Sequence, residues 1–209
     1  MSARRTGVGP PPGRRRVGAL VVWLLLAAVA VGGVLVVHGA MPGWYARMWY
    51  PLEHEEAIRT EAARSDLPPE LVAAVIYAES GFVPDSRSPK GAVGLMQVLP
   101  STATWMASRP TRPSPAPGDL EDPAVNIAYG AHLLGEHRRE FGSVPAALVA
   151  YNAGHEALRS WRRDARARGG TLRIPQDVPY PETRAYVGRV LEMEAIYRRA
   201  YGGELRSPG

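Results

Sequence analysis

The 209-residue sequence contains no cysteine, and this absence excludes several kinds of site at once. Disulfides, zinc–thiolate centres, thiol nucleophiles and a lipidated N-terminal cysteine all need a cysteine side chain. Histidines are few, and no two of the 5 are spaced i, i+4 as the ligands of a helical metal site would be. We therefore expect no metal site, and any exported part of the chain would be held by packing alone.

The sequence also lacks an excess of positive charge outside its first residues. The net charge is +5, and the first 16 residues contain five arginines and no acidic residue: Arg4, Arg5, Arg14, Arg15 and Arg16. Positive and negative charges balance in the remainder. This balance argues against a nucleic-acid partner, because such proteins carry a basic patch or stripe.

Charged residues are absent from Val17 to Val37. At about 1.5 Å per residue, a helix of this length spans about 30 Å, the hydrocarbon thickness of a bilayer. A secretory signal peptide is the alternative, but its apolar region is shorter and His38-Gly39-Ala40 is a poor cleavage site. We predict a transmembrane anchor at 17–37. Its preceding arginines favour a cytoplasmic tail at 1–16 and an extracytoplasmic remainder.

Aromatic residues follow the predicted anchor, within a juxtamembrane linker at 38–52. They are Trp44, Tyr45, Trp49 and Tyr50. Such residues are typical of the aromatic belt at a membrane surface. Packing of Trp49 and Tyr50 against the following domain is an equal alternative.

The rest of the chain predicts a mainly α domain over residues 53–202, followed by a tail at 203–209. Helical spacing and capping residues place helices at 53–64, 69–80, 101–105, 123–141, 145–151, 156–168 and 181–201. Ser101 and Asp122 are the expected caps of two of them. Proline and glycine mark irregular segments at 82–94, 109–118 and 169–181. No strand pattern and no internal repeat is present.

Glu79 lies eight residues after Leu71 and seven after Val72, on the same helix face as the apolar stripe that these residues begin. Burial would disfavour its charged form and raise its pKa, as a general acid near neutral pH requires. By itself the position proves little, since a glutamate at a helix end is more often a solvated side chain.

Short motifs follow one another in order along the chain. They are AESGF at 78–82, SPKGA at 88–92, GLMQ at 94–97, AYNAG at 150–154 and ETRAYV at 182–187. In this order and spacing they resemble the lytic transglycosylases of the soluble type, within the goose-type lysozyme-like group. The resemblance extends from about Leu67 to Tyr197. His155 departs from it, because family members commonly have proline or glycine there.

The resemblance implies a lysozyme-like helical domain that acts on the glycan strands of peptidoglycan. It assigns the role of catalytic acid/base to Glu79. The side chains that it implies in the substrate groove are Ser88, Met96, Gln97, Tyr151, Asn152 and Tyr186. It also implies cleavage of the MurNAc–GlcNAc β-1,4 bond with 1,6-anhydro-MurNAc ends and no cofactor. Together with the predicted anchor, it favours a single-pass protein of the cell (inner) membrane.

Two other functions stay open at this point. Ordinary glycosidases use two carboxylates, so Asp85 near Glu79 in space would favour a hydrolysing muramidase on the same fold. A non-catalytic cell-wall-binding protein would have no need of the acid. The basic run from Arg159 to Arg168 is interpreted as a solvated helix face, or as a patch for anionic wall polymers or lipid headgroups.

Overall fold

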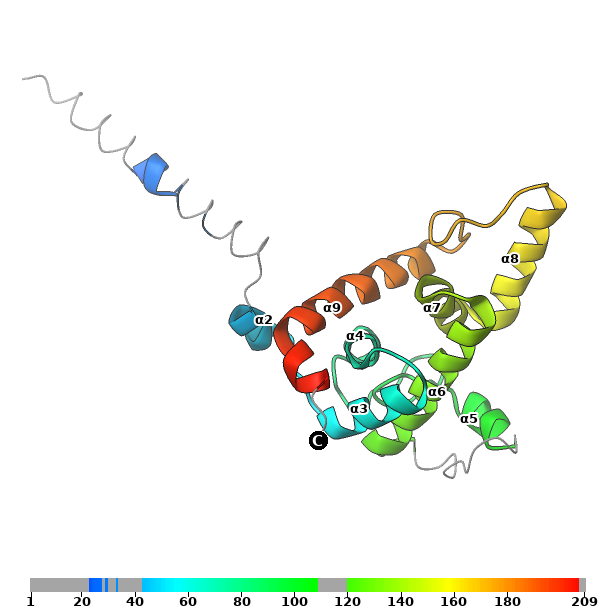
Figure 1. The fold of residues 1–209 in the computed structure, drawn as a ribbon, viewed down its shortest axis with the longest axis horizontal. Helices are drawn as coiled ribbons and strands as arrows, with labels where there is room; N and C mark the ends of the chain where they lie inside the picture. The colour runs from blue at the N-terminus through cyan, green and yellow to red at the C-terminus, as the bar shows by residue number, and fades with distance from the viewer. Residues whose placement is uncertain (1–22, 28, 30–32, 34–42, 109–119, 207–209) are drawn as a thin grey trace, which may run out of the picture. The chain divides into compact units, whose positions relative to one another are not determined.

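The computed structural model describes residues 23–27, 29, 33, 43–108 and 120–206, and the chain divides into two units, Met1–Pro42 and Gly43–Gly209 (Figure 1). In the first unit, residues 23–27 are helical and exposed. The predicted tail at 1–16 and most of the predicted anchor at 17–37 lie outside the described residues. Among those that are described, no helix has both the length and the apolar character needed to cross a bilayer.

The second unit is built around α4 (Pro69–Ser80), which Figure 1 views nearly end-on among the surrounding helices. The long helix α9 (Pro181–Arg206) packs along α4, and α3 (Glu55–Arg64) packs against both. Every residue of α4 from Glu70 to Ile76 is buried. The sequence predicted a one-sided apolar stripe on this helix. It is instead buried all round, because alanines complete its other faces.

Two capped helices form a second layer. The Asp122 carboxylate accepts a hydrogen bond from the Val125 amide at 3.0 Å at the start of α6 (Pro123–Phe141), as the sequence predicted. Gly142 ends α6, and Ser143 caps α7 (Val144–Ala153). α6 packs against α7 and α3, and α7 also packs against α8 (His155–Ala167) and α9.

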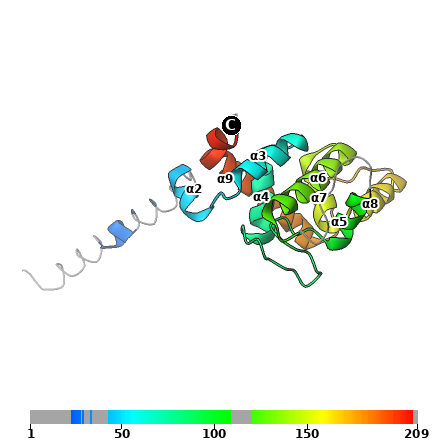
Figure 2. The ribbon, with the colours of Figure 1, turned by 90° about the horizontal axis from the view of Figure 1, so that it is seen from below.

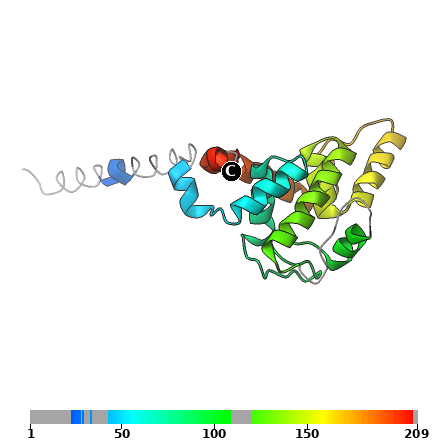
Figure 3. The same ribbon diagram turned by 60° about the horizontal axis from the view of Figure 1, so that its bottom comes forward.

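The described segment between α4 and α5 (Pro100–Ala107) contains isolated β-bridges instead of extended strands (Figure 3). The prediction that Ser101 caps α5 is wrong. Leu99 occupies the cap position, Pro100 begins the helix, and Ser101 lies inside its first turn. Figure 2 shows α5, α6 and α8 grouped at the end of the unit opposite α2 (Gly43–Trp49).

The end of α9 closes over the start of α4. The helix continues to Arg206, past its predicted end near Tyr201, and Leu205 is buried. Arg206 Nε lies 2.6 Å from Oε1 of Glu70, a fully buried carboxylate in the first turn of α4. Residues 203–206 thus belong to the packed structure.

Helix α2 packs against α9, and Arg47 adds hydrogen bonds to this contact. Arg47 donates from Nε and Nη2 to the Ala200 carbonyl oxygen at 3.0 and 2.8 Å. Of the predicted aromatic belt, Trp44 and Trp49 are 66% and 62% exposed, so the alternative of packing against the domain fails for Trp49. It holds for Tyr50, whose ring lies 5.2 Å from that of Tyr77.

Candidate active site

Glu79 occupies the last turn of α4, where the helix leaves the core and its side chains become half-buried. Gly81 ends the helix in the left-handed conformation, at φ 61°. The neighbouring Ser80 donates its hydroxyl to the Leu95 carbonyl oxygen at 2.8 Å. This hydrogen bond fixes the end of α4 against the loop that contains the GLMQ motif.

The environment of Glu79 favours its protonated form. Burial raises the pKa of this carboxyl, and the Tyr186 hydroxyl and the positive charge of Arg189 lower it by less. The net shift is upward, so the group holds its proton to a higher pH than a solvated glutamic acid. This agrees with the expectation drawn from its position on α4.

Two tyrosines lie close enough to Glu79 for its charge to affect their pKa values. Tyr186 is buried, and its hydroxyl makes no hydrogen bond of standard geometry within the described residues, although it lies close enough to Glu79 to lower the pKa of the carboxyl. Burial and the nearby charge of Glu79 raise the pKa of both Tyr186 and Tyr151 well above the usual value. Both phenols are therefore neutral hydrogen-bond donors.

The loop beside Glu79 is held by a buried asparagine on α6. Asn126 accepts from the Met96 amide at 2.7 Å and donates to the Val93 and Leu120 carbonyl oxygens, both at 2.8 Å. Gly94 has φ 81°, and a Cβ there would lie 2.2 Å from Nδ2 of Asn126. The motif needs glycine here because both the backbone angle and the close approach exclude a side chain.

Met96 lies behind this loop. Its side chain is fully buried against α6, where a Cβ on Gly130 would meet its sulfur at 2.5 Å. The Met96 carbonyl oxygen accepts a hydrogen bond from the Tyr151 hydroxyl at 2.7 Å. This burial does not fit the predicted contact between the Met96 side chain and substrate. The residue shapes the loop from inside instead.

Two other predicted groove residues stabilise turns. The Gln97 side-chain amide donates to the carbonyl oxygens of Ser86 at 3.1 Å and Gly94 at 2.9 Å. The Ser88 hydroxyl accepts from the Ala92 amide at 3.1 Å. Both side chains are half-buried, so part of each remains accessible to solvent.

Asn152 is exposed at the end of α7, and a residue of α9 orients it. The Thr183 hydroxyl donates to Oδ1 of Asn152 at 2.8 Å. Thr183 is itself buried and was not predicted as part of the site. Arg184 donates to the Val178 carbonyl oxygen at 2.6 Å, which fixes the chain just before α9.

No second acid acts on Glu79 within the described residues. Asp85 is exposed, and neither it nor any other described carboxylate is among the groups that shift the pKa of Glu79. The same part of the chain contains no group of His, Asp and Glu side chains able to hold a metal ion. The site thus contains one carboxyl of raised pKa, two neutral phenols and an oriented amide. Such a set of groups is suited to general acid–base catalysis.

The sequence matches the family described as "Transglycosylase SLT domain" over residues 56–174. It is 33% identical to the soluble lytic murein transglycosylase of Escherichia coli K12 over 155 residues, which are 73% of this chain and 24% of that protein. It is 39% identical to the transglycosylase of Enterobacteria phage PRD1 over 49% of this chain and 36% of that protein. The chain thus spans about a quarter of the length of the first of these relatives.

The similar solved structures are also lytic transglycosylases. The crystal structure of the 70 kDa soluble lytic transglycosylase of E. coli superposes with a TM-score of 0.65 at 32% identity, covering 76% of this chain and 26% of that one. An inactive mutant of the lytic transglycosylase Slt from Pseudomonas aeruginosa superposes with a TM-score of 0.66 at 31% identity, covering 76% and 26%. A 70 kDa soluble lytic transglycosylase in complex with bulgecin A superposes with a TM-score of 0.65 at 31% identity, covering 79% of this chain and 27% of that one.

Proposed function

The chain belongs to the SLT transglycosylase domain family, and from this premise we propose that it is a peptidoglycan lytic transglycosylase. Its reaction would be cleavage of the MurNAc–GlcNAc β-1,4 bond with formation of 1,6-anhydro-MurNAc ends. The observation that carries the proposal is Glu79, a half-buried carboxyl of raised pKa with no described carboxylate among the groups that shift it.

One carboxyl suffices for this reaction because it acts twice. Protonated Glu79 donates its proton to the glycosidic oxygen as the bond from the anomeric carbon to that oxygen breaks. The resulting carboxylate then accepts the proton of the muramic acid 6-hydroxyl, whose oxygen forms the new bond to the anomeric carbon. No water is consumed, and Glu79 ends protonated as it began. An intramolecular nucleophile has a high effective concentration, which replaces an enzyme nucleophile.

The surrounding residues take supporting roles in this proposal. Tyr186 supplies a neutral donor close to Glu79, while Tyr151 donates a hydrogen bond to the Met96 carbonyl oxygen and fixes the loop beside the acid. Asn152, oriented by Thr183, presents a fixed amide to the sugar. Ser88 and Gln97 hold the turns that form the wall of the groove. Donors fixed before the substrate binds need no reorganisation during the reaction.

The identity of the acid can be tested by replacing it with its amide. Glu79→Gln keeps the shape of the side chain and removes the transferable proton. We expect loss of murein clearing in a zymogram, while Glu56→Gln on the exposed side of α3 keeps full activity as the matched control. Clearing by the Glu79→Gln variant would show that another group is the acid. Clearing by neither wild type nor variant would favour a non-catalytic wall-binding protein.

The place of action is part of the proposal. An uncharged run from Val17 to Val37 behind five arginines supports a single-pass anchor in the inner membrane, with the catalytic unit outside the cytoplasm. Protease added to spheroplasts is expected to degrade the catalytic unit of the full chain and leave a cytoplasmic control protein intact. Protection of the catalytic unit until lysis would contradict this orientation.

A further inference from the structure

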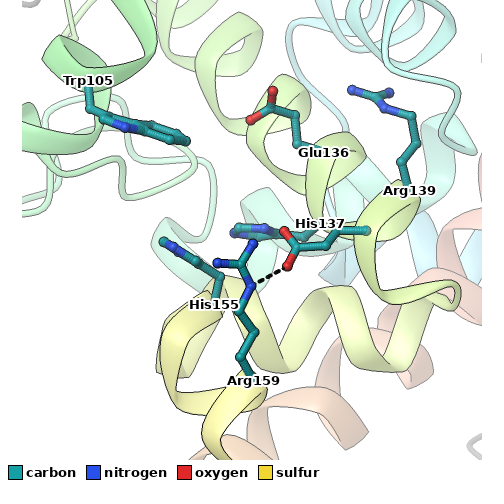
Figure 4. Close-up of a pocket in the computed structure, with 7 residues that line it drawn as sticks. Trp105, Glu136, His137, Arg139, His155 and Arg159 are labelled. Carbon is teal, nitrogen blue, oxygen red and sulfur yellow. Dashed lines mark hydrogen bonds and ion pairs between the residues drawn. The ribbon is translucent and has the colours of Figure 1, made fainter. Parts of the chain in front are cut away.

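A cavity of about 500 Å³ opens between α5, α6 and α8, and it contains none of the residues assigned to the Glu79 site (Figure 4). Its volume is within the range of small-ligand sites. The side chains that line it are Trp105, Glu136, His137, Arg139, Glu140, His155 and Arg159. The cavity is referred to below as the Trp105 pocket.

The charges of the Trp105 pocket are balanced. Its lining includes two arginines and two glutamates. Arg159 Nε pairs with Oε1 of Glu140 at 2.6 Å, and Nη1 pairs with Oε1 of Glu156 at the same distance. A strongly anionic or cationic ligand would have to compete with these pairs. A neutral ligand with many hydroxyl and amide groups would instead find both donors and acceptors.

The histidines add to this mixed character. His137 is buried, and its ring centroid lies 6.0 Å from that of His155. Burial and the neighbouring His155 lower the pKa of His137 to about 4. At neutral pH its imidazole is therefore uncharged, with one nitrogen that donates and one that accepts.

Trp105 gives the pocket a flat aromatic surface. The side chain is 45% exposed on α5, and Figure 4 shows its ring directed toward the space between His155 and Glu136. The face of an aromatic ring is electronegative and attracts the weakly positive C–H groups of an apolar ligand face. A pyranose ring combines such a C–H face with hydroxyls at its edge.

The chain connects this pocket directly to the Glu79 site. α5 begins at Pro100, three residues after Gln97, and α8 begins at His155, three residues after Asn152. Three residues of extended chain span at most about 11 Å, which limits the separation of His155 and Asn152 along the backbone. A glycan strand that passes Asn152 is thus within reach of the pocket.

We propose that the Trp105 pocket is an accessory binding site for a neutral N-acetylated sugar of the glycan strand, away from the bond that is cut. This inference rests on the proposed function of the Glu79 site. The rival occupant is the zwitterionic peptide stem of peptidoglycan. The existing Arg159–Glu140 pair and the exposed indole face favour the sugar.

The test uses the full chain with the Glu79→Gln substitution, so that a sugar ligand is bound without being cut. The indole N–H signals of the ¹⁵N-labelled protein are followed by NMR during titration with the tetramer of N-acetylglucosamine, and Trp105→Phe identifies the Trp105 signal. We expect a saturable shift of Trp105, while the exposed Trp44 and Trp49 of α2 do not respond.

A second variant separates the pocket from the Glu79 groove. Arg159→Ala removes one wall of the pocket, and we expect the apparent Kd reported by Trp105 to rise roughly threefold to tenfold, the scale of one lost contact. An unchanged Kd in Arg159→Ala, no response of Trp105 to the sugar, or a response to a free stem tetrapeptide in its place would each overturn the proposal. Formation of anhydro ends by the wild type would be unaffected by these outcomes, so the two proposals fail separately.

Discussion

The hydroxyl of Tyr151 donates a hydrogen bond of 2.7 Å to the backbone carbonyl oxygen of Met96, joining the end of α7 to the loop beside Glu79. The same phenol lies near enough to Glu79 for the carboxylate to raise its pKa. One side chain thus fixes the loop and contributes to the electrostatic environment of the acid. The hydrogen bond links the AYNAG motif to the GLMQ motif in space.

Tyr151→Phe removes this hydrogen bond and leaves the Met96 carbonyl oxygen without it. We expect kcat on murein to fall about tenfold, the scale of one lost positioning interaction, and the free energy of unfolding to fall by about 1 kcal/mol. Steady-state assays and urea unfolding measure the two effects. Tyr180→Phe, at an exposed ring, is the control and should match the wild type in both. Equal kcat values for wild type and Tyr151→Phe would refute this role.

Gly94 and Gly91 form a matched pair for testing the tight loop. Both have positive φ, 81° and 79°, but a Cβ on Gly94 would lie 2.2 Å from Asn126, whereas nothing lies within 4 Å of one on Gly91. Gly91→Ala should cost about 1–2 kcal/mol, from the backbone angle alone. Gly94→Ala should cost more, because it also displaces the buried Asn126. Thermal unfolding compares the two variants. An equal loss of stability in both would mean that the contact with Asn126 does not add to the cost of Gly94→Ala.

The raised pKa of Glu79 predicts how its contribution to stability depends on pH. The folded state holds this proton to a higher pH than the unfolded state, so ionisation of Glu79 destabilises the fold as pH rises through the folded pKa. Glu79→Gln cannot ionise and should be more stable than the wild type near pH 7. The difference should vanish below the ordinary pKa of 4.5. Urea unfolding across this range tests it, and a variant less stable than the wild type near pH 7 would contradict the assigned shift.

Arg189 influences the pKa of Glu79 from the surface of the domain. It is exposed on α9, and its positive charge lowers the pKa of Glu79. Arg189→Gln should therefore raise that pKa and move the descending limb of the pH–rate profile to higher pH, since the reaction needs protonated Glu79. Added salt should reduce the difference by screening. Arg163→Gln, exposed on α8, should leave the profile in place. A downward displacement of the limb in Arg189→Gln would contradict this.

The end of α9 is predicted to stabilise the unit through Glu70. A chain ending at Gly202 loses Arg206 and the buried Leu205 and leaves the Glu70 carboxylate buried without its partner. We expect the free energy of unfolding to fall by about 3 kcal/mol or more. Removal of residues 207–209 alone is the control and should have little effect. Equal stability of the two shortened chains would contradict a role for this ion pair.

Helices with strong local signals were predictable from the sequence. Asp122 followed by Pro123 indicated the start of α6, and the structure shows Asp122 as its cap. Prediction failed where the signal came from tertiary contacts. Ser101 has a cap-forming side chain, but the chain before Pro100 is already in the cap conformation. The end of α9 depends on Arg206 meeting Glu70, a residue 136 positions away that no local pattern reveals.

The candidate site shows the same division. Helical spacing and the ordered motifs indicated Glu79, and its raised pKa agrees with that interpretation. The motifs alone did not distinguish side chains that face a ligand from those that support the loop, as the burial of Met96 shows. Thr183 was missed because its contact with Asn152 joins residues on different helices. The buried Asn126 belonged to a recognised helix, but its hydrogen bonds to the loop appear only in the fold.

Mass spectrometry of murein fragments released by the full chain tests the central claim most directly. If Glu79 acts without a second carboxylate and the sugar's own hydroxyl is the nucleophile, every new muramic acid end will be an anhydro end, lighter than a reducing end by one water. In ¹⁸O-labelled water these ends will carry no label, and Glu79→Gln will release none. Reducing muramic acid ends that carry ¹⁸O would instead show hydrolysis and contradict the account.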